Sequence, residues 1–197
     1  MELRLPTGEE LKLAYRRDMT PAFPRMERRP LRVIKQLCDA GLYRPWCLFD
    51  GRELTGEAFI WAFEEGYALL DYLCITESLR NAGLGSMLIG QLLKAERSNI
   101  VFGEVEIPAY APDPDKAERR LGFYRRNGFT KAFYDINLFG VPYHTLYRAG
   151  AEVDERALLS AHQRCYRQKM GKLIFETCIR IPWNEGMGQM KKTDWKE

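Results

Sequence analysis

The sequence predicts an α+β fold, in which a mixed, mostly antiparallel central sheet carries helices on both faces. Three observations support this prediction. Two strand-like segments flank the turn Asp50-Gly51, which is typical of an antiparallel hairpin. A nearly continuous apolar segment, 67–75, follows and has the character of a strand that is buried on both faces. The hydrophobic period then becomes helical over 83–97, and strand-like and helix-like segments alternate from there.

Length and composition fit one globular domain. The chain has 197 residues, of which 46% are hydrophobic and 29% charged, so we expect a single domain over 1–197. Its core is expected at about 42–147, after variable N-terminal helices (1–41) and before a C-terminal helix and strand (150–197). The formal net charge of +3 is too small to indicate a nucleic-acid or membrane partner.

The cysteines and the hydropathy predict a cytoplasmic protein without a metal. The five cysteines are scattered, with no C-x-x-C pair, which is typical of free thiols in a reducing compartment. Only two histidines accompany them, so a zinc site is not expected. The sequence has no recognisable signal peptide, and no apolar segment reaches the roughly 18 residues of a membrane span.

In the N-terminal part, the expected elements are a short strand, a helix, a loop and a second helix. The strand is expected at 3–5. Thr7 and Glu10 have the spacing of a capping box, so a helix should follow and run as far as the loop. Three prolines and alternating charge over 19–30 indicate that loop. Pro30 is a favourable first residue for the second helix.

The rest of the chain follows from the same rules. The expected strands are 46–49, 54–63, 67–75, 100–107, 129–138 and 141–147, and the expected helices are 83–97 and 116–127. After these, a polar helix is expected over 154–170, a last strand over 173–181, and a mobile tail from Pro182.

One short motif joins the buried strand to the amphipathic helix. It reads Arg80-Asn81-Ala82-Gly83-Leu84-Gly85-Ser86. Glycines allow the backbone to turn tightly and to bring several N–H groups to the positive end of the helix, which is a ready-made anion site. A side chain at Gly83 or Gly85 would block the approach of a pyrophosphate. The plainer alternative is that the glycines only end a strand–helix turn.

The features that the motif lacks narrow the choice of anion. No Gly-Lys-Ser/Thr follows, so the P-loop pattern is excluded. The dinucleotide fingerprint requires three glycines and a parallel strand–helix–strand start to the chain, and neither is present. Coenzyme A is therefore the better candidate.

The loop resembles the acetyl-CoA loop Q/R-x-x-G-x-G/A of the GNAT acetyltransferases, matched by Arg80, Gly83 and Gly85. A second segment, Phe123-Tyr124-Arg125-Arg126-Asn127-Gly128-Phe129, looks like the helix-to-strand segment of that family. The resemblance covers about 42–139. It implies the GNAT-like acyl-CoA N-acyltransferase fold and acetyl-CoA as cosubstrate. The implied cofactor-binding residues in the loop are Arg80, Asn81, Ala82, Gly83, Leu84, Gly85 and Ser86.

The resemblance also implies roles for the strand before the loop and for one tyrosine. In the family, this strand splays from its neighbour, and its backbone pairs with the pantetheine arm of the cofactor. By position, this role falls to Leu73, Cys74 and Ile75. Tyr124 matches the family tyrosine whose hydroxyl protonates the departing sulfur. For all four residues, an ordinary place in the core is the alternative.

The general base is sought among the carboxylates, because an amine with a pKa of about 10.4 must lose a proton before it attacks. Glu104 and Glu106 lie two apart on an expected strand and project from one face. Two neighbouring carboxylates in an apolar segment are one way to obtain a base that works near neutral pH. The family often has a glutamate near this position, which favours Glu104. Asp71 is a weaker candidate, and a structural role for the pair stays open.

The sequence departs from the family pattern on the helix that carries Tyr124. Many relatives have an asparagine one to two turns before the tyrosine, where this chain has Ala117 and Glu118. Arginines of this helix could contact the phosphates instead, or form a solvated face: Arg119, Arg120, Arg125 and Arg126. His144 could line an acceptor pocket or be structural. A covalent route through Cys74 is not expected, since no histidine is placed to activate it.

These observations together predict an N-acetyltransferase that moves an acetyl group from acetyl-CoA to a primary amine by direct attack in a ternary complex. The alternatives are a non-catalytic CoA-binding module with a regulatory or partner-binding role, and an acyltransferase for a longer acyl group. The acceptor stays open among a peptide N-terminus, lysine, polyamine, aminoglycoside and small metabolite. A homodimer is possible but not derivable from the sequence.

Overall fold

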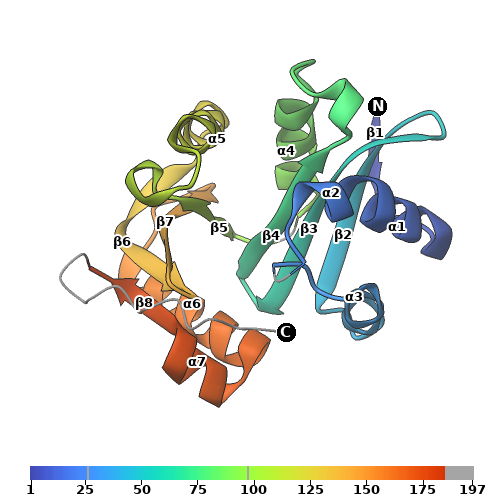
Figure 1. Cartoon of the computed structure of the whole chain (residues 1–197). Coiled ribbons are helices and arrows are strands. Elements are labelled where there is room, and N and C mark those ends of the chain that lie inside the picture. Colours follow the sequence, from blue (N-terminus) through green and yellow to red (C-terminus); the bar gives the residue numbers. More distant parts are fainter. Residues whose placement is uncertain (26, 97, 185–197) are drawn as a thin grey trace. The chain divides into compact units, whose positions relative to one another are not determined.

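A computed structural model describes residues 1–25, 27–96 and 98–184 of the chain (Figure 1). The contacts within it group into two compact units, Met1–Asn99 and Ile100–Glu197. Each unit combines helices with antiparallel strands. The expected α+β fold class is therefore confirmed.

The first unit holds four strands in the order β1-β2-β3-β4, and each neighbouring pair is antiparallel. The strands are β1 (Glu2–Arg4), β2 (Tyr43–Asp50), β3 (Glu53–Glu64) and β4 (Tyr67–Ile75). The helices are α1 (Gly8–Ala14), the π-helical η1 (Tyr15–Met19), α2 (Thr20–Ala22), α3 (Leu31–Asp39), the 3-10 turn η2 (Glu77–Leu79) and α4 (Leu84–Ala95). Both α1 and α4 pack on β3. Residues 54–61 of β3 are all buried, and because alternate side chains point to opposite faces, both faces of this strand are covered.

Local sequence rules account for most of these elements. Thr7 and Glu10 form the expected capping box at the start of α1, in which Glu10 Oε2 accepts from the Thr7 N–H at 2.7 Å. Gly51 has a φ of 59°, the left-handed conformation that the tight turn between β2 and β3 requires. The strand expected at 67–75 is β4, with the same bounds.

The second unit holds four strands in the order β5-β7-β6-β8, again antiparallel. The strands are β5 (Ile100–Glu106), β6 (Thr130–Leu138), β7 (Val141–Ala149) and β8 (Ile179–Trp183). The helices are the 3-10 turn η3 (Pro108–Tyr110), α5 (Pro114–Arg126), α6 (Glu155–Met170) and α7 (Lys172–Cys178). Helix α5 packs on β5, whereas α6 packs on β6 and β8.

Two predictions about local structure were wrong. The loop expected from residue 19 starts later, because Met19 ends η1 and α2 continues to Ala22. The strand expected over 173–181 is mostly helix α7, and only its end belongs to β8. Gly171 has a φ of 76°, which turns the chain from α6 directly into a second helix. Phe175 then packs under the Arg167 guanidinium, 4.9 Å from the ring centroid to Cζ, and this contact favours helix over the strand propensity of the segment.

The tail expected from Pro182 lies partly in β8, which includes Pro182 and Trp183. The remainder of that prediction, 185–197, falls outside the described residues. In the part of the chain that is described, no helix combines the length and the apolar character needed to cross a bilayer.

Candidate active site

The glycine motif forms the connection between η2 and α4 in the first unit. Gly83 adopts the left-handed conformation (φ 80°) as the N-terminal cap residue of α4, and Asn81 is also left-handed (φ 67°). No side chain of the described residues caps this helix. Its first turn, Leu84 to Ser86, therefore keeps its backbone N–H groups and the positive end of the helix dipole available to an anion.

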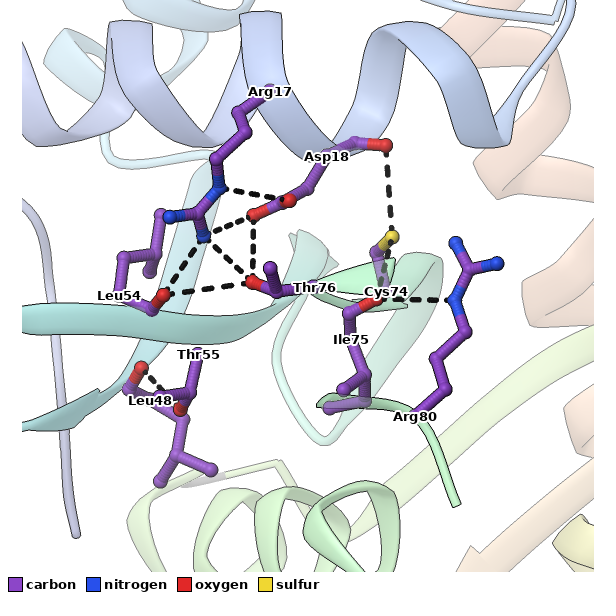
Figure 2. Close-up of polar contacts among 9 residues, drawn as sticks. All are labelled: Arg17, Asp18, Leu48, Leu54, Thr55, Cys74, Ile75, Thr76 and Arg80. Atoms are coloured by element: carbon purple, nitrogen blue, oxygen red, sulfur yellow. Dashed lines mark hydrogen bonds and ion pairs between the residues drawn. The ribbon is translucent and has the colours of Figure 1, made fainter. Parts of the chain in front are cut away.

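The space beside the loop is open. A Cβ atom built on Gly83 would meet no other atom within 4 Å, and residues 80–83 are exposed. Arg80 holds the loop in shape, because its Nε donates to the Ile75 carbonyl oxygen at 3.3 Å across the connection (Figure 2). The loop thus has an exposed, glycine-lined approach to the start of α4, as an anion site requires.

The last residues of β4, Leu73, Cys74 and Ile75, pair with Ala58, Glu57 and Gly56 of β3. The two backbones lie close together at Gly56, where an added Cβ atom would lie 2.9 Å from the Cys74 carbonyl oxygen and 2.6 Å from the Ile75 Cδ1 atom. Burial, followed by the charges of Glu57 and Asp18, raises the pKa of the Cys74 thiol to about 12. A thiol that keeps its proton is a poor nucleophile, in agreement with the direct route.

A polar network fixes the point where β4 leads into the loop (Figure 2). The Nη2 atom of Arg17, on η1, donates to Asp18 Oδ2 at 2.6 Å, to the Leu54 carbonyl oxygen at 2.8 Å and to Thr76 Oγ1 at 2.6 Å. Thr76 Oγ1 in turn donates to Asp18 Oδ2 at 3.2 Å. Since Thr76 directly follows β4, this network ties the end of that strand to η1 and to the start of β3. Arg17 and Asp18, which are consecutive residues of η1, were not singled out from the sequence.

Glu57 is a second buried carboxyl near this junction. Its residue is 0% exposed, and neither carboxyl oxygen has a hydrogen-bond partner in the described part of the chain. Burial, and then the charge of Asp18, raise the pKa of Glu57 well above its ordinary value. Glu57 therefore keeps its proton under conditions in which an exposed glutamate is ionised.

In the second unit, Glu104 lies on β5 and faces α6. Glu104 Oε1 is 2.9 Å from His162 Nε2 and accepts a hydrogen bond from the Tyr166 hydroxyl at 3.1 Å. The Glu104 side chain keeps 10% of its surface exposed, whereas that of His162 is fully buried. Glu106 does not share these partners, because it pairs with Arg120 at 3.0 Å. The two carboxylates that the sequence placed on one face thus have separate partners.

Tyr124 lies on α5 and is half-buried between two aromatic rings. The centroids of Phe123 and Phe129 are 5.3 Å and 5.2 Å from its own. Burial raises the pKa of the Tyr124 hydroxyl to about 12, with Arg120 lowering it and Glu104 raising it. A hydroxyl of this kind keeps its proton throughout the neutral range, as a general acid must.

The other candidates have structural partners. Asp71 accepts from the Tyr43 hydroxyl at 2.6 Å and pairs with Arg29 at 3.3 Å, with 6% of its side chain exposed. His144 Nδ1 lies 2.8 Å from Asp135 Oδ1 on the neighbouring strand. The four arginines of α5 are exposed: Arg119, Arg120, Arg125 and Arg126. Within the described residues, no group of three or more His, Cys, Asp or Glu could hold a metal ion.

The sequence reasoning missed His162 and Tyr166, the two partners of Glu104. Both lie on the buried face of α6, together with Leu158. Their four-residue spacing was a readable signal that they share this face. The spacing does not predict that this face of α6 contacts Glu104, because that contact depends on tertiary packing.

Comparisons with known proteins agree with this architecture. Residues 42–131 match the family model described as an acetyltransferase (GNAT) domain. No curated protein sequence matches the chain. A solved structure assigned to the GNAT acetyltransferases, from Bacteroides thetaiotaomicron, superposes with a TM-score of 0.71 at 20% identity and covers 87% of this chain and 99% of its own.

Two further solved structures have named acceptors. The ribosomal-protein-S18-alanine N-acetyltransferase of Escherichia coli has a TM-score of 0.57 at 17% identity, covering 78% of this chain and 96% of its own. The spermidine N-acetyltransferase of Vibrio cholerae, solved with CoA and spermine, has a TM-score of 0.59 at 12% identity, covering 75% and 94%. At these identities the structures show a shared fold. The family match over residues 42–131 agrees with the resemblance to the GNAT acetyltransferases that the glycine loop and the helix-to-strand segment predicted.

Proposed function

We propose that the protein is an acetyl-CoA-dependent N-acetyltransferase that acts on a primary amine in the cytoplasm. One observation carries the proposal: within the matched family segment, left-handed Gly83 opens the uncapped N-terminus of α4 to an anion. The pyrophosphate of CoA would bind there, on the backbone of 80–86. The pantetheine arm would pair with the backbone of Leu73, Cys74 and Ile75.

The proposed chemistry is direct transfer without an acyl-enzyme. The amine nitrogen attacks the thioester carbonyl carbon, so a C–N bond forms and the C–S bond breaks. Glu104 accepts the proton that the amine nitrogen gives up, directly or through one water. Tyr124 donates its proton to the departing CoA thiolate, and its raised pKa means that the proton is present at neutral pH. The high pKa of Cys74 supports the absence of a covalent step.

The acceptor is proposed only as a class, a primary amine. The names of the structural neighbours give spermidine and an alanine of ribosomal protein S18 as acceptors, and polyamines and peptides with an N-terminal alanine therefore belong in a substrate panel. The alternative function is a CoA-binding module without catalysis, in which Glu104 is a structural partner of α6 and Tyr124 a core residue. The following experiments separate the two.

Ligand-induced stabilisation tests the cofactor. A ligand at a hundredfold excess over its Kd adds about 2.7 kcal/mol to the free energy of unfolding, which for a chain of this size is a Tm increase of roughly 5–10 °C. Acetyl-CoA and CoA should give similar increases, and ATP a much smaller one, because ATP has no pantetheine arm. An ATP effect as large as that of CoA would contradict the assignment of the loop to CoA.

Steady-state kinetics test the chemistry. With a panel of polyamines, lysine and peptide N-termini, Tyr124→Phe should lower kcat about 100-fold with little change in the KM for acetyl-CoA, as expected when a general acid is lost. Tyr147→Phe is the matched control, because it also removes a single tyrosine hydroxyl, one that donates to Glu155 at 2.9 Å and has no role in the proposed chemistry. CoA binding without turnover of any amine would favour the non-catalytic module.

A further inference from the structure

A buried chain of polar side chains lies behind Glu104 in the second unit. The Tyr134 hydroxyl is 3.2 Å from His162 Nδ1, and His162 Nε2 is 2.9 Å from Glu104 Oε1. Tyr166 donates to the same carboxylate oxygen at 3.1 Å. His162 is 0% exposed, and the two tyrosines are 3% and 2% exposed. The geometry points to His162 as a positioning residue that, with Tyr166, holds one oxygen of Glu104 and leaves the other to accept the proton of the substrate amine.

The partners of His162 determine which way its ring donates. The Glu104 carboxylate can only accept, so the ring must carry a hydrogen on Nε2. In the neutral ring, Nδ1 is then an acceptor, and the Tyr134 hydroxyl donates to it. Tyr134 thus selects the tautomer that His162 needs in order to donate to Glu104. This is the arrangement of a side chain that orients another side chain.

The aromatic packing around His162 fixes the ring. The centroids of Phe102, Tyr134 and Tyr166 lie 4.8 Å, 5.9 Å and 5.4 Å from the imidazole centroid. Phe102 precedes Glu104 by two residues on β5, so both side chains point to the same face. A ring held on three sides cannot swing away from the carboxylate without repacking the core.

Two donors converge on Oε1 of Glu104, and none of the described residues donates to Oε2. A carboxylate that is held through one oxygen keeps its second oxygen in a defined direction, which is what a base requires to meet a substrate N–H group. In the transfer, the N–H bond of the amine breaks and an O–H bond forms at Oε2. His162 and Tyr166 keep their own protons throughout and do not touch the substrate.

This inference rests on the proposed function, because it assigns a supporting residue to the proposed base. A purely structural role would make the same contacts, namely a strut that joins α6 to β5. The two roles differ in what a substitution changes. If His162 is purely structural, its substitution lowers the free energy of unfolding. If His162 is a positioning residue, its substitution lowers kcat, and it does so only through Glu104.

The test compares His162→Leu, which removes both ring nitrogens, with His162→Gln, whose amide N–H can still reach Glu104. His162→Leu should lower kcat at least tenfold, with the KM for acetyl-CoA and the CoA-induced Tm increase unchanged. His162→Gln should recover most of the lost kcat. Tyr166→Phe should lower kcat by a smaller factor of roughly threefold to tenfold, because one donor to Oε1 stays in place. Tyr147→Phe removes a tyrosine–glutamate hydrogen bond to the same helix, at 2.9 Å, and should leave kcat unchanged.

A double-mutant cycle with Glu104→Gln decides whether His162 acts through Glu104. If it does, the double variant should be no slower than Glu104→Gln alone, because the two substitutions disable one unit. Multiplied effects, or a His162→Gln variant as slow as His162→Leu, would overturn the inference. If His162→Leu does not fold, the same cycle is run with Tyr166→Phe, and a kcat equal to wild type there would also overturn it. If Glu104→Gln itself turns over like wild type, the proposed base is wrong, which is a distinct failure.

Discussion

Replacing Glu57 by glutamine tests the protonation state that the fold imposes on a buried carboxyl. Burial, and then the charge of Asp18, raise the pKa of Glu57 well above the ordinary value of 4.5. A carboxyl whose pKa is raised by folding contributes its full stability below the unfolded value, and that contribution is lost as the pH rises toward the folded value. Over this interval the free energy of unfolding should fall by about 1.4 kcal/mol for each pH unit.

Glutamine has the shape of the protonated acid and no charge to lose. Glu57→Gln and the wild type should therefore have similar stability near pH 4.5 and diverge above it, with the variant more stable by up to about 1.4 kcal/mol per pH unit. At a denaturant slope of about 2.5 kcal/mol per molar urea, this is a difference in midpoint of roughly 0.5 M urea per pH unit. Urea unfolding followed by circular dichroism between pH 4.5 and 8 measures it.

The control and the refuting result are both defined by the structure. Glu53 lies on the same strand but is exposed, so Glu53→Gln should leave the pH dependence of stability as it is in the wild type. A Glu57→Gln curve parallel to that of the wild type at every pH would refute the reasoning, since it would mean that ionising Glu57 has no folding cost. The same result would remove the case for a buried, protonated carboxyl beside β4.

Two further predictions concern the glycine loop and the Arg44–Glu96 ion pair of the first unit. Gly83→Ala should lower the free energy of unfolding by about 1 kcal/mol, because Gly83 has a φ of 80°. Gly90→Ala, at an exposed site of α4, should raise the free energy of unfolding by about 0.5–1 kcal/mol. Thermal unfolding measures both changes, and a Tm that moves in the same direction in both variants would contradict this. Arg44→Met should cost roughly 3 kcal/mol at pH 7, because Arg44 Nη2 pairs at 2.5 Å with Glu96, whose side chain is 1% exposed.

The Arg44 effect should also depend on pH, in the opposite sense to that of Glu57. Burial raises the pKa of Glu96, but the hydrogen bond and charge of Arg44, with Trp46 and Ser98, outweigh burial and leave it lowered. A carboxyl with a lowered pKa contributes stability above its unfolded value and loses that contribution as the pH falls. The cost of Arg44→Met should therefore shrink in urea unfolding at pH 4 relative to pH 7, and an equal cost at both would count against the ion pair.

The elements that could be predicted from the sequence are those set by neighbours along the chain. The capping box at Thr7, the turn at Gly51 and the apolar strand β4 each depend on a few consecutive residues. The glycine loop belongs to the same class, because the backbone of α4 and its preceding turn are local. Helix α7 was missed because its strand-like composition is overridden by packing of Phe175 against α6.

The parts of the site that could not be predicted depend on contacts between distant segments. Glu104 and His162 are separated by 58 residues, and Arg17 and Thr76 by 59. Spacing on one strand or helix shows which side chains share a face, but it does not show which face meets which. The ion pair between Glu106 and Arg120 also depends on how α5 packs on β5, so the spacing of Glu104 and Glu106 on one strand did not predict it.

The position of α6 has a consequence for how relatives are compared. Glu104 lies inside the segment 42–131 that the family model matches, whereas His162 and Tyr166 lie outside it. A sequence comparison restricted to residues 42–131 therefore leaves out His162 and Tyr166, the two side chains that contact the Glu104 carboxylate. Hybrid chains that exchange the residues after 149 with those of a relative would keep the glycine loop and alter the surroundings of Glu104. Under the proposed function, the two parent proteins would then contribute separately to cofactor affinity and to the rate.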